Sequence, residues 1–215
     1  MKQKIINFMQ HLLNSKIYIL FISRLYSFDK LSRYNKSASR VFKEKLFRTY
    51  NFSNGAWVET GTYLGETSKY LSNIAQHVYT IEPSKKYFNA AKEMLSKEKN
   101  ITLIHGTSEE NLEKVISKIN IDKISFWLDG HYSGADTFEG KHHSPILFEL
   151  EIIEKYLYKF KRVNILIDDF RIFNKNYPKS NKVNYPDHRE LIYWIKKNNL
   201  SWSVEKNILI INFKC

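Results

Sequence analysis

One segment sets the architecture of this chain, and it reads Trp57-Val58-Glu59-Thr60-Gly61-Thr62-Tyr63-Leu64-Gly65-Glu66-Thr67-Ser68. A short apolar strand enters a glycine turn, and a helix begins just after it. Gly61 and Gly65 can adopt positive φ and let a ligand approach the backbone closely. Thr67 or Ser68 lies near the helix start, where free N–H groups collect. Doubly wound α/β domains hold nucleotide-type cofactors at such a turn.

The spacing of the turn argues against a dinucleotide. It is G-x-x-x-G rather than G-x-G-x-x-G, and Tyr63 stands where a second glycine would let the backbone reach a pyrophosphate. Glu59, two residues before Gly61, would also repel a pyrophosphate. A carboxylate at this position suits a cofactor that carries an ammonium and a sulfonium group and no phosphate.

Strand and helix alternate from residue 56 onward, which predicts βαβ units and a mostly parallel sheet. We expect strands at 56–59, 78–82, 101–104, 124–129, 163–168, 201–205 and 208–213. We expect helices at about 39–50, 66–76, 84–98, 107–119, 144–160 and 188–198. The last two strands flank Lys206-Asn207 as a two-residue turn, so they form a terminal antiparallel hairpin.

The glycine turn and its acid resemble the first motif of the class I S-adenosylmethionine-dependent methyltransferases, which reads acid-x-Gly-x-x-x-Gly. The terminal hairpin is what that family's fold adds to the dinucleotide-binding fold. The resemblance covers roughly residues 40–215 and implies an α/β, Rossmann-like methyltransferase fold with a mostly parallel seven-stranded sheet, preceded by N-terminal helices. It implies an enzyme that uses S-adenosyl-L-methionine, with cofactor contacts from Glu59, Gly61, Thr62, Gly65 and Thr67.

Two further strand ends carry expected cofactor contacts. Glu82 lies about 20 residues beyond the glycine turn, where an acid can accept both ribose hydroxyls. The alternative is a solvated acid at a strand end. After the third strand, the resemblance places Thr107 and Ser108 at the edge of the adenine. Thr107 also begins a Thr107-x-x-Glu110 capping box, so it can equally be a simple helix cap.

Acids end the fourth and fifth strands, at Asp129 and at Asp168-Asp169. Three carboxylates brought together repel one another unless a cation or protons neutralise them, and oxygen ligands without cysteine favour Mg²⁺. The arrangement resembles the metal-dependent small-molecule and sugar O-methyltransferases, which are macrocin- and catechol-O-methyltransferase-like. It implies that Asp129, Asp168 and Asp169 hold the metal and that Asp129 also serves the cofactor and catalysis. The alternative is that Asp169 caps a loop and Asp168 alone faces the ligand.

His131 is the best candidate for a general base. Methyl transfer is an in-line displacement at a sulfonium, so the enzyme must position the two partners and remove the acceptor proton. Imidazole titrates near neutrality, and two residues past Asp129 it can reach the mouth of the site. The alternative is a loop histidine hydrogen-bonded to Asp136 or to a partner strand.

Length and composition bound the remaining possibilities. A chain of 215 residues can form one domain with a sizeable core. The net charge of +12 permits attraction to nucleic acid, anionic lipid or acidic glycans, although much of it reads as compositional bias. The single cysteine, Cys215, excludes an internal disulfide framework and fits a reducing compartment, so we expect a cytoplasmic protein.

We expect residues 1–38 to form a separate helical segment ahead of a methyltransferase domain at 39–215. Polar residues interrupt it too often for a membrane-spanning helix, and no small-residue cleavage site follows a clean apolar core. The segment either covers the core or a dimer partner, which makes a homodimer plausible, or lies on a membrane surface, peripheral to its inner face.

Three functions compete at this point. The first is an O-methyltransferase for a hydroxyl of a sugar or another small molecule, linked to surface glycan biosynthesis by the resemblance alone. The second is an RNA methyltransferase, suggested by the basic charge, but no arginine-rich arm or separate RNA-binding module supports nucleic acid as a partner. The third is a non-catalytic basic scaffold associated with a membrane, against which Glu59, Gly61, Glu82 and Asp129 all count.

Overall fold

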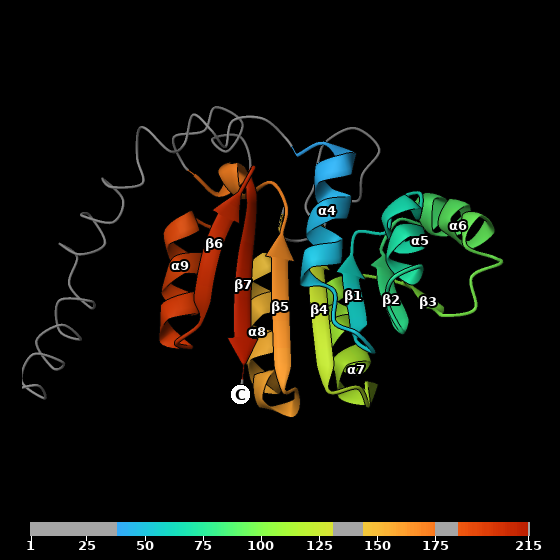
Figure 1. The fold of residues 1–215 in the computed structure, drawn as a ribbon. Coiled ribbons are helices and arrows are strands. Elements are labelled where there is room, and N and C mark those ends of the chain that lie inside the picture. Colours follow the sequence, from blue (N-terminus) through green and yellow to red (C-terminus); the bar gives the residue numbers. More distant parts are fainter. Residues whose placement is uncertain (1–37, 131–143, 175–184, 215) are drawn as a thin grey trace, which may run out of the picture.

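The computed structural model describes residues 38–130, 144–174 and 185–214 (Figure 1). Within these residues, seven strands form one sheet in the order β3-β2-β1-β4-β5-β7-β6. The strands are β1 Ala56–Thr60, β2 His77–Glu82, β3 Ile101–His105, β4 Lys123–Leu128, β5 Arg162–Ile167, β6 Ser201–Glu205 and β7 Ile208–Lys214. β1 to β5 pair in parallel, and β7 runs antiparallel to both β5 and β6. The predicted mostly parallel sheet with a terminal antiparallel hairpin is therefore confirmed.

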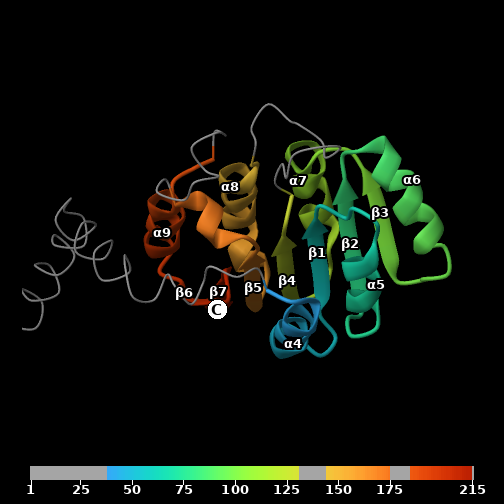
Figure 2. The same cartoon turned by 90° about the horizontal axis from the view of Figure 1, so that it is seen from above.

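Helices cover both faces of the sheet (Figure 2). They are α4 Arg40–Tyr50, α5 Glu66–Ser72, α6 Lys85–Met94, α7 Ser108–Lys118, α8 Ile146–Tyr156 and α9 His188–Lys197, with 3-10 turns η1 Leu157–Lys159 and η2 Phe170–Phe173. One core cluster joins α7, α8 and α9 to one face, and the other joins α4 and α5 to the opposite face. The inner strand β1 is buried along its whole length, as expected of a parallel strand covered on both sides.

Local sequence signals account for most element boundaries. The predicted capping box at Thr107 forms, with reciprocal bonds to Glu110, and a second one forms between Asp187 and Glu190 at the start of α9. The hairpin turn places Lys206 at φ 41° and Asn207 at φ 71°. Two successive left-handed residues match the right-handed twist of the strands they join, which is why a two-residue turn is enough here.

Three helices differ from their predicted limits. α5 ends at Ser72 and α6 at Met94, each a turn earlier than expected. α8 begins at Ile146, so Pro145 is its N-cap and not its first residue. The Ser144 hydroxyl accepts a bond from the Ile146 N–H at 3.4 Å, just before the helix begins. Residues 1–37 of the predicted N-terminal segment lie outside the described residues, and no described helix is long and apolar enough to cross a membrane.

Candidate functional site

The glycine turn connects β1 to α5 and lies against the end of β4. Gly61 has φ +85°, and a Cβ atom placed on it would lie 2.7 Å from the carbonyl oxygen of Asp129. Gly65 also has φ +85° and is the N-cap of α5. Tyr63 between them has φ 52° although it is not a glycine. The turn is thus pressed against the neighbouring strand end, and only glycine fits at residue 61.

Glu59 lies beneath this turn as a fully buried acid, 1% exposed. Its Oε2 atom accepts hydrogen bonds from the hydroxyls of Ser68 and Thr80, the latter at 2.7 Å. The hydroxyl of Thr62 lies 2.6 Å from that of Thr80 and extends the chain of bonds. Burial raises the pKa of Glu59 to about 8, because the hydrogen bonds offset only part of the desolvation and the charges of Asp129 and Glu82 add to it.

Glu82 holds the other side of the turn and is 5% exposed. Its two carboxyl oxygens accept bonds from the backbone N–H groups of Tyr63, at 2.7 Å, and Ser84, at 2.9 Å. Burial raises its pKa, although both backbone bonds act in the opposite direction. The bond to Tyr63 explains how the turn keeps a non-glycine residue at positive φ, and it places the acid expected to bind a ribose against the glycine turn.

The remaining expected cofactor residues are helix-start residues. Thr67 and Ser68 lie in the first turn of α5, and Thr107 and Ser108 begin α7. The Thr107 hydroxyl accepts from the Glu110 N–H at 3.3 Å, so its capping role is confirmed, and its adenine contact stays a prediction. Ser108 is 6% exposed at the same helix start.

The three acids after β4 and β5 have different partners. β4 and β5 are adjacent, as the prediction required, and the Asp129 N–H donates to Thr60 at 3.1 Å. Asp168 is 5% exposed and forms an ion pair with Lys43. Asp169 accepts a bond of 2.7 Å from the Asn207 amide and lies 3.5 Å from the Arg171 guanidinium. Asp169 therefore fixes the loop after β5, which agrees with the alternative considered for it.

Lys43 on α4 is the residue that sequence reasoning missed. Burial alone would lower its pKa, but the carboxylates of Asp168, Asp129 and Asp169 outweigh that effect, so its pKa is raised and it stays charged. Its Nζ atom lies 5.1 Å from the centre of the Trp127 ring. The predicted Mg²⁺ ligand set does not fit this arrangement: across residues 38–130, 144–174 and 185–214, no three acidic, histidine or cysteine side chains are placed to bind a metal ion.

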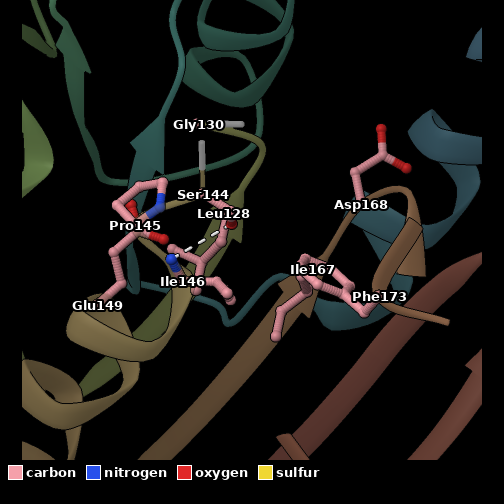
Figure 3. A pocket seen from close by; sticks show the side chains of 9 residues that line it. All are labelled: Leu128, Gly130, Ser144, Pro145, Ile146, Glu149, Ile167, Asp168 and Phe173. Atoms are coloured by element: carbon pink, nitrogen blue, oxygen red, sulfur yellow. Dashed lines mark hydrogen bonds between the residues drawn. The ribbon is translucent and has the colours of Figure 1, made fainter. Parts of the chain in front are cut away.

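A small pocket opens beside these acids at the ends of β4 and β5 (Figure 3). It is lined by Leu128, Gly130, Ser144, Pro145, Ile146, Glu149, Ile167, Asp168 and Phe173. Asp168 approaches from the end of β5, and Glu149 approaches from the first turn of α8 (Figure 3).

Glu149 is 1% exposed, and sequence reasoning missed it as well. Its spacing of three residues from Ile146 and four from Ile153 places it on the buried face of α8, which is the signal that could have found it. The predicted base His131 lies outside the described residues.

Comparisons with known proteins give matches at the level of structure. No protein-family model matches the sequence, and no curated protein matches it. A caffeoyl-CoA O-methyltransferase-like protein from Staphylococcus aureus is 19% identical with a TM-score of 0.51, over 100% of this chain and 99% of that one. A methyltransferase-like protein from Streptococcus mutans, in complex with SAH, is 14% identical with a TM-score of 0.51, over 83% and 98%.

A methyltransferase from Geobacter sulfurreducens is similar in the same way, at 13% identity and a TM-score of 0.50 over 99% of this chain and 96% of that one. At such low identity, these matches establish the fold alone, and any argument about the chemistry has to come from the residues of the site. The strand order and the terminal hairpin described above agree with them. The chain therefore has the Rossmann-like fold of the class I S-adenosylmethionine-dependent methyltransferases, as its glycine turn predicted.

Proposed function

We propose that this protein is an S-adenosylmethionine-dependent O-methyltransferase that transfers a methyl group to a hydroxyl of a sugar or another small molecule. The proposal depends above all on one observation. Two buried carboxyl groups, Glu59 and Glu82, flank a glycine turn at the ends of adjacent strands β1 and β2. Ligands of doubly wound sheets bind outside the carboxyl ends of the strands. Carboxyl groups on both sides of the glycine turn suit a cofactor with an ammonium group and ribose hydroxyls.

The reaction asks two things of the protein. The acceptor oxygen attacks the methyl carbon as the carbon–sulfur bond breaks, which leaves S-adenosylhomocysteine and a methyl ether. The chain must hold acceptor and sulfonium in line and take up the proton that the hydroxyl loses. Asp129 follows β4 beside the glycine turn, where it can orient the reacting groups. His131, two residues further on, is the proposed base.

The pocket at the ends of β4 and β5 is the proposed acceptor site. Most of its lining is apolar, and its two acids, Asp168 and Glu149, are buried at 5% and 1% exposure. Buried acids accept hydrogen bonds from hydroxyl groups and repel phosphates, so this lining favours a small neutral hydroxyl compound over an RNA backbone. A role in surface glycan biosynthesis would follow if the acceptor is a sugar.

Calorimetry on the full chain tests the cofactor. We expect S-adenosylhomocysteine to bind and NAD⁺ to give no heat beyond dilution. Binding of NAD⁺ without S-adenosylhomocysteine would overturn the proposal. The acceptor is then tested by transfer of a labelled methyl group from S-adenosylmethionine to sugars and phenols, with total RNA in parallel. Label that enters RNA and no small hydroxyl compound would favour the RNA methyltransferase instead.

A further inference from the structure

We propose that the Lys43 ammonium is a built-in cation that takes the place of a divalent metal ion beside the acceptor pocket. The inference deepens the proposed function and rests on it, since it concerns the acceptor end of the same site. In this arrangement the acids after β4 and β5 are neutralised by a side chain of α4. No ion from solution is needed to hold them together.

The geometry of Lys43 supports this role. Its side chain is 26% exposed, and that of its ion-pair partner Asp168 is only 6% exposed. Asp168 also lines the acceptor pocket, so the ammonium lies one side chain away from the place proposed for the acceptor. A divalent ion bound to Asp168 would have to displace this ammonium or bear its repulsion at close range.

The balance of charges favours a lysine at this position over a cluster of carboxylates that has no counter-ion. Asp168, Asp129 and Asp169 all attract the Lys43 ammonium, and together they outweigh the cost of its burial. Three acids close together would otherwise raise one another's pKa values or recruit a cation. One fixed positive charge reduces that repulsion. It also weakens the field that would draw Mg²⁺ into the site.

The surrounding contacts hold the ammonium and the third acid in place. Lys43 lies over the Trp127 ring, and the neighbouring α4 residue Phe47 packs edge-on against the same ring with 4.9 Å between centroids. Asp169 is already engaged by Asn207 and Arg171. Moving Lys43 aside to admit a metal ion would break a cation–π contact and an ion pair, and Asp169 would have to leave its partners as well.

The chemical consequence concerns the acceptor proton. A bound metal lowers the pKa of a coordinated hydroxyl, so a weaker base is enough to remove its proton. An ammonium offers hydrogen bonds and charge and has no coordination sites. The proposed reaction then requires a protein base, and it proceeds without added metal.

Manganese binding, followed by the electron paramagnetic resonance of free Mn²⁺, tests the proposal on the full chain with and without S-adenosylhomocysteine. We expect no binding to the wild type at millimolar Mn²⁺. Lys43→Met should bind Mn²⁺ at least about tenfold more tightly than the wild type, because the substitution leaves the carboxylates without their counter-ion. Adding Asp168→Asn to Lys43→Met should remove that site. Lys45→Ala, an exposed lysine two residues along α4, is the matched control and should behave as wild type.

Two results would overturn the inference. One is Mn²⁺ binding to the wild type that Asp168→Asn abolishes, and this measurement stands even if Lys43→Met does not fold. The other is methyl transfer that stops in EDTA and returns with Mg²⁺. Calorimetry with S-adenosylhomocysteine on the same samples separates the two proposals. A wild type that binds neither Mn²⁺ nor S-adenosylhomocysteine refutes the methyltransferase function and leaves the cation assignment standing.

Discussion

The side-chain amide of Asn207 donates a hydrogen bond of 2.7 Å to the carboxylate of Asp169, which joins the β6–β7 turn to the loop after β5. Asn207 is 1% exposed, and its side-chain oxygen accepts from the Arg171 N–H at 2.7 Å. Its backbone carbonyl also accepts from the Phe170 N–H at 2.8 Å. The terminal hairpin therefore supports the loop that begins with the two acids of the candidate site.

Replacing Asn207 should loosen this loop. Asn207→Ala removes both side-chain bonds and leaves buried partners unsatisfied, so we expect a loss of about 1–3 kcal/mol in the free energy of unfolding, measured by urea denaturation. Asn207→Gly is the matched variant, because it loses the same bonds and relieves the positive φ. It should be destabilised less than Asn207→Ala. An alanine variant as stable as wild type would mean that the side-chain bonds contribute nothing.

Glu59→Gln should change how stability depends on pH. The pKa of Glu59 is about 8 in the folded protein and about 4.5 by its ordinary value, so folding takes up a proton between these values. Its contribution to wild-type stability is therefore fully present below pH 4.5 and is lost as pH rises through 8. The free energy of unfolding of Glu59→Gln, measured by urea denaturation, should therefore rise relative to that of the wild type between pH 5 and pH 8.

The exposed Glu93→Gln on α6 is the control for Glu59, since it makes the same exchange at the surface. It should show no such trend. If the free energies of unfolding of Glu59→Gln and the wild type changed with pH in parallel, Glu59 would have to be ionised in the folded protein. That result would contradict the effect of burial described above.

Glu82→Ala should weaken S-adenosylhomocysteine binding. The change removes the expected acceptor of the ribose hydroxyls and also the bond that holds the Tyr63 N–H. Loss of hydrogen bonds to a charged group corresponds to about 1.5–3 kcal/mol, or roughly tenfold to more than a hundredfold in the dissociation constant. Calorimetry measures it, and the exposed Glu113→Ala on α7 is the control. An unchanged dissociation constant for Glu82→Ala would remove the ribose role.

His131→Ala should lower turnover and leave S-adenosylhomocysteine binding unchanged, because a base acts on the acceptor and not on the cofactor. General-base catalysis contributes about 10²–10⁴-fold. Comparing methyl-transfer rates with calorimetric affinities separates the two effects. Full turnover in the variant would show that His131 is not the base. The buried carboxyl groups of the acceptor pocket, Asp168 and Glu149, would then be the next candidates.

Local signals explain why so much of the fold could be predicted. The two-residue turn Lys206-Asn207 between two strand segments marks the hairpin, and capping boxes of only a few residues mark the starts of α7 and α9. The adjacency of β4 and β5 followed from the expected topology. Each of these inferences needs only neighbouring residues or the strand order.

The cation at the acids could not be read in the same way. Lys43 and Asp168 are 125 residues apart in the sequence, and the sequence of α4 gives no sign that one of its two lysines points inward. The sequence indicated only that the acids need a cation or protons to neutralise them. Only the packing of α4 against the sheet shows which group supplies it.

Helix α4 packs Phe47 against both Trp57 and Trp127, at 5.6 and 4.9 Å between ring centroids. A recombinant version shortened to begin at β1 would lose the packing of α4 on Trp57 and Trp127. It would also lose the Lys43 ammonium beside the candidate site. A shortened version should therefore keep Ser39, whose hydroxyl caps that helix, and all of α4 after it. The two tryptophans, in turn, offer a built-in fluorescence gauge of whether the helix is seated.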